Sequence, residues 1–94
     1  MNFEWDETKR IGNLEKHKID FAEAVTIYSD FVYTFQDRRE DYGEERFVSL
    51  GLLYGVEIAL VFTPRGHNRR IISVRRARSA ERDKYYAERK KVEF

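Results

Sequence analysis

The spacing of hydrophobic residues in the first third of the chain predicts a short strand followed by two helices. Apolar and polar residues alternate over positions 1–5, as they do in a strand. Asp6 stands where a helix N-cap is favoured, ahead of a helical segment over 7–17. Beyond Asp20, apolar residues recur at i, i+3, i+4 and i+7, which predicts a second helix over 21–28. We expect these two helices to form a hairpin or an angled pair.

The pattern then changes to short β-type runs and ends in a polar helix. Runs rich in β-branched and aromatic residues are separated by polar loops or a tight turn, and they cover 31–36, 46–53, 56–63 and 69–77. The third run is apolar on both faces, so we expect it at the centre of the sheet. Connections this short join antiparallel neighbours. The last segment has Ser79 as its expected N-cap and Tyr85 or Tyr86 as its main apolar contact.

This order of elements predicts a single domain of the α+β class over residues 1–94. We expect a short N-terminal strand, two helices, an antiparallel sheet of about four strands and a C-terminal helix. The chain contains no cysteine, and its two histidines lie far apart, so we expect neither a metal nor a cofactor. No signal peptide and no run of roughly 20 apolar residues is visible, so we expect a cytoplasmic protein without a membrane partner.

Charge divides unevenly along the chain. Residues 1–64 carry 7 Lys/Arg against 13 Asp/Glu, a net charge of −6, whereas residues 65–91 carry 11 against 3, a net charge of +8. A basic block on an otherwise acidic chain suggests a polyanionic partner such as RNA, although a solvated terminal helix is the alternative. We expect RNA contacts from these basic side chains: Lys16, Arg65, Arg70, Arg76 and Arg78.

The last predicted strand carries a candidate phosphate-binding residue. Because side chains alternate along a strand, we place Ile72 and Val74 on the face that the helices cover. Arg75 then projects from the open face, where a guanidinium can grip a phosphate through two parallel hydrogen bonds. The alternative is that Arg75 pairs with a glutamate across the sheet, for example Glu45 or Glu57.

Cleaving RNA without a metal requires a proton acceptor, a proton donor and a cation that stabilises the pentacovalent phosphate. Arg75 suits the role of the cation. His17, Glu45 and Tyr85 are candidates for proton transfer, although a histidine at a helix end also suits the last helical carbonyls. Arg46 either reaches the same face or pairs with the glutamates that precede it.

Taken together, these segments resemble the BrnT family of bacterial toxins. The first part of the chain carries D-x-x-K from Asp6 and N-x-x-K-H-x-I-x-F-x-x-A from Asn13. The middle carries Y-G-E-E-R-F from Tyr42, and the end carries R-I-I-S-V-R-R-A from Arg70, followed by Glu81. The segments come in the order of the family and span nearly the whole chain.

The resemblance implies a RelE-like fold and a ribonuclease toxin that halts translation by cutting RNA. It also implies a partner, a BrnA-like antitoxin with a ribbon-helix-helix part, through which the complex would bind its operator DNA. Five residues match positions of the family's motifs, without a secure division of catalytic roles among them: Lys16, His17, Glu45, Arg46 and Arg75.

The chain departs from the family's usual pattern at several positions. Lys18 replaces a glycine and must adopt a left-handed conformation at some strain, unless the turn differs. Arg78 replaces a Thr or Ser cap, which Ser79 could take over, and Val74 replaces an alanine. Pro64 stands where the family often has glutamate, which would lower activity if that glutamate acts in catalysis. These departures leave open a non-catalytic RNA- or partner-binding module with the same fold.

Overall fold

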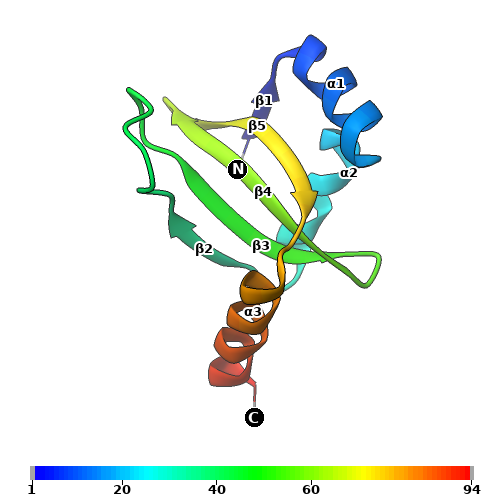
Figure 1. The fold of residues 1–94 in the computed structure, drawn as a ribbon, viewed down its shortest axis with the longest axis vertical. Helices are drawn as coiled ribbons and strands as arrows, with labels where there is room; N and C mark the ends of the chain where they lie inside the picture. The colour runs from blue at the N-terminus through cyan, green and yellow to red at the C-terminus, as the bar shows by residue number, and fades with distance from the viewer. Residues whose placement is uncertain (1, 94) are drawn as a thin grey trace.

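The computed structural model describes residues 2–93 and arranges them as one mixed sheet with helices on both faces (Figure 1). The elements in chain order are β1 (Asn2–Trp5), α1 (Glu7–His17), α2 (Phe21–Ala24), the 3₁₀ turn η1 (Val25–Ser29), β2 (Tyr33–Gln36), β3 (Phe47–Leu53), β4 (Val56–Arg65), β5 (Asn68–Arg76) and α3 (Ser79–Val92). Met1 and Phe94, which the predicted domain includes, lie outside the described residues. The predicted α+β class is confirmed.

The sheet has five strands in the order β1-β5-β4-β3-β2. Strands β2 to β5 form the predicted antiparallel sheet, and β1 extends it by pairing in parallel with β5. The chain leaves β1, crosses one face of the sheet through α1 and α2, and enters the opposite edge as β2. Successive antiparallel pairs then bring β5 back beside β1, and the two strands run in the same direction. β4 lies in the middle, as the apolar residues on both of its faces predicted.

The helix ends follow local capping rules. The Asp6 carboxylate accepts a hydrogen bond from the Lys9 N–H at 3.1 Å, and Asp20 caps the next helix in the same way. Lys18 has φ = 62° and closes α1 in the left-handed conformation that a glycine would adopt without strain. The predicted second helix tightens into η1 after Ala24. Within residues 2–93, no helix is both long and apolar enough to cross a membrane.

The larger hydrophobic core lies between the sheet and the N-terminal helices. Its buried members are Phe21, Ala24, Ile27, Ile58, Leu60, Phe62, Ile71 and Val74. Gly51 allows η1 to approach β3 closely, because a Cβ atom at this position would lie 2.9 Å from the Cβ of Ile27.

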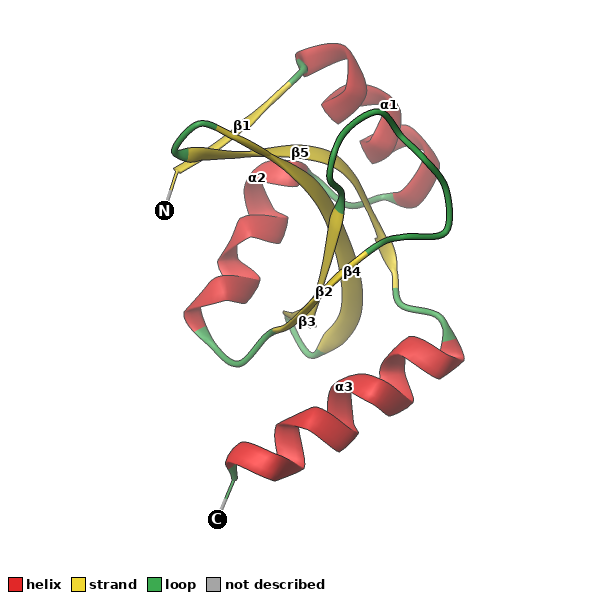
Figure 2. Ribbon diagram, turned by 90° about the vertical axis from the view of Figure 1, so that its left-hand side faces the viewer, coloured by secondary structure: helices red, strands yellow, loops and turns green. Residues whose placement is uncertain are grey.

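The opposite face of the sheet is only partly covered. α3 packs mainly on β2 and β3 and runs across one end of the sheet, away from α1 and α2 (Figure 2). Its anchor is Tyr85, which is 1% exposed and joins Val48, Leu50 and Ala59 in a second, smaller core. We expected the helices to cover one face well and to leave the other face open. Instead, α3 covers part of the second face, and the remainder forms the surface described below.

Candidate functional site

A β-bulge in β5 decides which of its side chains share a face. The pairing register with β4 shifts after Val61, so that Ile72 has no partner there. Ile71 and Val74 therefore both lie in the core next to α1 and α2. The prediction for Val74 is confirmed. Ile71 joins it in the core, although strict alternation places Ile71 on the face of Arg75, because alternation does not anticipate an extra residue in a strand.

Arg75 follows Val74 and lies on the opposite face, as predicted, but it is neither uncovered nor unpaired. Its two terminal nitrogens donate to the two carboxylate oxygens of Glu81, at 2.7 and 3.0 Å, and both side chains are only 16% exposed. The expectation of a free guanidinium is wrong, and so are the partners suggested for it, Glu45 and Glu57. Glu81 reaches Arg75 because the chain turns at Ala77 and the first turn of α3 returns towards β5.

Glu81 also caps the N-terminus of α3. Its carboxylate also accepts the N–H of Arg78, the N-cap residue, at 2.8 Å. The hydrogen bonds from Arg75 are the largest cause that holds the pKa of Glu81 below its ordinary value, against an opposing effect of burial. Ser79 is the first helical residue and not the N-cap, so the capping role predicted for it is wrong.

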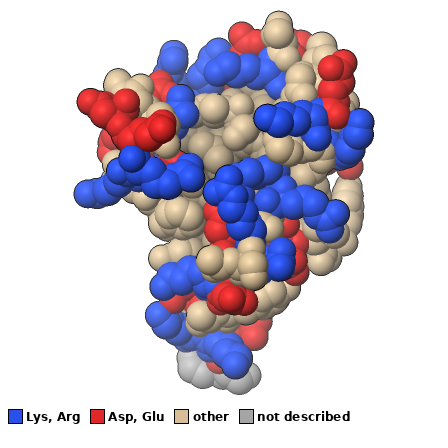
Figure 3. Space-filling model, viewed as in Figure 1, with Lys and Arg blue, Asp and Glu red and all other residues tan. Residues whose placement is uncertain are grey.

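Arg75 and Glu81 form one wall of a surface groove of about 340 Å³. The lining comes from the end of β2 and the loop after it, from β3 and β5, and from the start of α3: Phe35, Gln36, Asp37, Arg38, Arg39, Val48, Arg75, Arg78, Ala80 and Glu81. Four arginines thus meet two carboxylates over an apolar floor. In Figure 3, Lys and Arg side chains surround an uncharged area on this face of the molecule.

The opposite wall of the groove is organised by Asp37, whose side chain is 5% exposed. It accepts two hydrogen bonds from the Arg39 guanidinium, at 3.0 and 2.9 Å, and one from the Tyr42 hydroxyl at 3.1 Å. These contacts, with Arg39 first, lower the pKa of Asp37 from 3.8 to about 2. The carboxylate therefore stays ionised at neutral pH and ties the β2–β3 loop to the end of β2.

Two of the predicted proton-transfer residues do not reach this groove. His17 ends α1 and lines a separate hollow on the other face, together with Tyr54 and Arg76. Tyr85 is a core residue whose hydroxyl donates to the Phe31 carbonyl at 3.2 Å and accepts from Arg89 at 2.9 Å. The prediction of a catalytic Tyr85 is wrong, because a phenol this buried cannot contact a substrate.

The other predicted residues lie in or near the β2–β3 loop but outside the groove lining. Glu45 is exposed. Arg46 stacks over the Tyr42 ring at 4.1 Å and pairs with Glu44 at 3.4 Å, which was the second alternative considered for it. Both contacts are with residues of the β2–β3 loop.

The predicted RNA-binding residues are spread over several surfaces. Arg78 is exposed and lines the groove. Arg70 donates to Glu4 at 2.8 Å, so its charge is partly neutralised. The others are exposed but lie outside the groove: Lys16, Arg65 and Arg76.

Sequence reasoning missed four charged groove residues as parts of a site: Asp37, Arg38, Arg39 and Glu81. The run of charges that starts at Asp37 predicts an ordinary polar loop, and Glu81 appears in the sequence only as a position that matches the family. The i, i+2 spacing of Asp37 and Arg39 was the available signal. No comparable signal linked Glu81 to Arg75.

The groove suits the binding of a phosphodiester. Guanidinium groups from β5, the start of α3 and the β2–β3 loop line it, and a guanidinium can donate paired hydrogen bonds to phosphate oxygens. Two of them, Arg75 and Arg39, are already paired with Glu81 and Asp37, so a phosphate has to displace these carboxylates to bind there. The described residues 2–93 contain no group of three His, Asp or Glu side chains placed to hold a metal ion.

Comparison with known proteins identifies the class of this molecule. Residues 5–81 match a family model described as ribonuclease toxin, BrnT, of type II toxin-antitoxin system. No curated protein matches the chain significantly. The family match covers most of the chain, including every strand from β2 to β5 and the paired Arg75 and Glu81. The chain therefore belongs to the BrnT family of ribonuclease toxins of type II toxin-antitoxin systems.

Proposed function

We propose that this toxin cleaves RNA in the groove between α3 and the β2–β3 loop, without a metal, and thereby inhibits translation in the cytoplasm. The observation that carries the proposal is the convergence of four arginines on one groove, with Arg75 held on a rigid strand. A scissile phosphate that enters the groove exchanges the Glu81 carboxylate for its own oxygens at the Arg75 guanidinium.

In the proposed reaction, the ribose 2′-oxygen attacks the adjacent phosphorus and the bond to the 5′-oxygen breaks. The 2′-hydroxyl gives its proton to solvent water, the leaving 5′-oxygen takes a proton from solvent water, and the products are a 2′,3′-cyclic phosphate and a 5′-hydroxyl end. Arg75 and Arg78 stabilise the additional negative charge of the pentacovalent phosphate, as fixed cations do in a preorganised site. Charge stabilisation thus takes the largest share of the rate, because no histidine is among the residues that line the groove.

Arg75→Gln tests this role. Because the substitution leaves Glu81 without its cation, the double variant Arg75→Gln/Glu81→Gln is the better probe: it removes both charges and retains amide groups that can hydrogen-bond to each other. We expect both variants to lose about 10²-fold or more in RNA cleavage, the usual cost of removing one donor to a transition-state oxyanion. Lys9→Gln, which removes an exposed charge on α1, is the matched control and should cleave normally.

The assay incubates purified, folded protein with single-stranded and ribosome-bound RNA and maps new ends, with and without EDTA. In cells, expression of the wild type without its antitoxin should arrest growth and deplete messenger RNA, and expression of the double variant should not. Full cleavage by the double variant would overturn the proposed site. Loss of cleavage in EDTA would overturn metal independence alone.

A non-catalytic binding module remains the second candidate, and the pairing of Arg75 with Glu81 favours it, because the central cation is already neutralised. Pro64, whose replacement of a glutamate also suggested reduced activity, lies at the exposed end of β4 and does not line the groove. RNA binding without new RNA ends, from wild-type protein at high concentration, would favour the module.

Membership of the family implies a cognate antitoxin. We propose that this antitoxin is BrnA-like, that its ribbon-helix-helix part binds the operator DNA, and that an acidic segment of it covers the groove arginines. Covering these charges would block RNA and explain inhibition by the same electrostatics that bind the substrate.

A further inference from the structure

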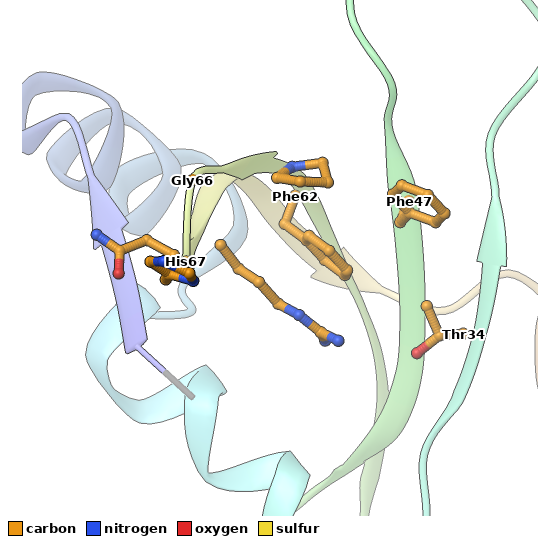
Figure 4. A pocket seen from close by; sticks show the side chains of 8 residues that line it. Thr34, Phe47, Phe62, Gly66 and His67 are labelled. Carbon is orange, nitrogen blue, oxygen red and sulfur yellow. The ribbon is translucent and has the colours of Figure 1, made fainter.

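A second hollow lies on the opposite face of the sheet from the groove, between the edge strand β2 and the β4–β5 turn (Figure 4). Its volume is about 360 Å³, and it opens to solvent. Its lining comes from β2, β3, β4, β5 and the turn: Thr34, Phe47, Phe62, Pro64, Gly66, His67, Asn68 and Arg69. No function described above uses this hollow, which we call the turn pocket.

One wall of the turn pocket is aromatic. The rings of Phe47 and Phe62 stack with their centroids 5.6 Å apart and their planes 19° from parallel, and Figure 4 shows them side by side on β3 and β4. Phe62 is 3% exposed, whereas Phe47 is only half-buried and lines the pocket. A flat ring is therefore available on this wall to stack with another flat group.

The cation of the pocket is Arg69. Its guanidinium lies over the Phe62 ring at 4.4 Å and near the Tyr28 ring at 5.4 Å. Among residues 2–93, no carboxylate lies within ion-pair distance of Arg69, although the next residue, Arg70, pairs with Glu4. Stacking on aromatic rings holds the guanidinium in place without neutralising it.

The remaining polar groups of the pocket add no negative charge. His67 is exposed at the turn, and Asn68 already donates its amide to Glu4 at 3.0 Å. No Asp or Glu belongs to the lining. The pocket thus combines a flat apolar wall with an unneutralised cation, which complements a ligand that has both an aromatic ring and a negative charge.

We propose that the turn pocket binds one nucleotide of the single-stranded RNA substrate, with the base against Phe47 and a phosphate at Arg69. The inference rests on the proposed ribonuclease function and names a second contact for the same substrate. Neighbouring residues of β2 connect the two places, because Thr34 lines the turn pocket and Phe35 lines the groove. A single-stranded RNA bound at Arg75 thus reaches the turn pocket by passing over β2, the edge strand of the sheet.

A carboxylate side chain of a protein partner is the other ligand that Arg69 could bind. The ring of Phe47 favours a nucleotide, because every base has a π-face that stacks on it, whereas a carboxylate would leave this wall unused. The two occupants are distinguished by experiment.

The test measures binding of a short fluorescein-labelled 2′-O-methyl oligoribonucleotide, which lacks the attacking hydroxyl and cannot be cleaved. Arg69→Gln is compared with Arg65→Gln, which removes the same charge from an exposed residue near the same turn but outside the pocket. We expect Arg69→Gln and Phe47→Leu each to raise Kd about tenfold, as the loss of one stacked or charge-paired nucleotide does. Arg65→Gln should raise Kd only about twofold, by its share of the general electrostatic attraction.

Equal effects of Arg69→Gln and Arg65→Gln, or an unchanged Kd for Phe47→Leu, would overturn the inference. A loss of antitoxin binding without a loss of RNA binding would overturn it in favour of a protein occupant. Should the variants fold poorly, wild-type protein can be crosslinked to RNA that contains 4-thiouridine. Adducts at Phe47 or His67 are then expected, and adducts confined to other surfaces contradict the inference.

These outcomes are separate from those for cleavage. Failure of the proposed function is read from unmodified RNA as an absence of new ends, even where the 2′-O-methyl RNA still binds through the pocket. The proposal for the turn pocket is refuted by an unchanged Kd for the 2′-O-methyl RNA in the pocket variants, even where these variants cleave RNA normally.

Discussion

Replacing Asp37 with asparagine should destabilise the toxin in a way that depends on pH. The substitution keeps the size of the side chain and one acceptor oxygen, but it removes the charge that holds Arg39 and Tyr42. The shift of the Asp37 pKa from 3.8 to about 2 corresponds to about 2 kcal/mol. Because the Arg39 side chain is 67% exposed, solvent screening reduces the expected loss to about 1–2 kcal/mol.

The sign of the pH dependence follows from the direction of the shift. A carboxylate with a lowered pKa stabilises the folded state fully above its unfolded pKa, and it loses this contribution as the pH falls through the folded value. Wild type and Asp37→Asn should therefore differ most at neutral pH. The difference should shrink once the pH falls below 3.8 and should approach zero near 2.

Urea unfolding followed by circular dichroism over this pH range measures the difference in the free energy of unfolding. Asp41→Asn is the matched control, because Asp41 lies in the same loop and only caps the Gly43 N–H, which an asparagine can also do. The control should stay within about 0.5 kcal/mol of wild type. A difference between wild type and Asp37→Asn that is absent at neutral pH, or equally large in acid, would refute the assigned role of the charge.

Two further substitutions test the backbone and the groove. Lys18→Gly should stabilise the fold by about 0.5–1 kcal/mol in urea unfolding, because glycine adopts the left-handed φ of 62° without strain. Lys16→Gly, inside the helix, is the control and should destabilise the fold by about 1 kcal/mol. Effects of the same sign for both variants would contradict the assignment of strain to Lys18. Glu81→Gln should lower the free energy of unfolding by about 2 kcal/mol at neutral pH. Because the pKa of Glu81 is lowered, this loss should begin to shrink below pH 4.5 and should vanish only once the pH has fallen through the lower folded pKa. The same variant frees Arg75 and should lower the Kd for 2′-O-methyl RNA several-fold; unchanged RNA affinity would show that Glu81 does not compete with the phosphate.

Local signals predicted the elements well, because they act within a few residues of one another. Asp6 caps α1 as its type and position predict, and Lys18 takes the strained conformation that the departure from glycine suggested. β4 is central because only a strand buried on both faces can be apolar on both. The resemblance to the family extended this local information to the class of activity, which the family match bears out.

Register and pairing were beyond local signals. A hydrophobic period of two does not reveal an extra residue, and the bulge at Ile72 therefore moved Ile71 to the face assigned to its neighbour. The parallel pairing of β1 with β5 joins Phe3 to Arg69, two residues that are distant in the sequence, and no local pattern encodes such a contact.

The candidate site likewise has one feature that the sequence predicted and several that it did not. From its sequence alone, the chain was expected to present an arginine on its last strand, on the face away from the N-terminal helices, and that placement is correct. Only the tertiary structure decided that Glu81 neutralises this arginine, that Asp37 and Arg39 complete the groove and that Tyr85 is core. The physical reason is that side-chain pairing depends on where whole elements pack. The position of α3 against β2 and β3 is set by the burial of Tyr85, many residues away from the strands it contacts.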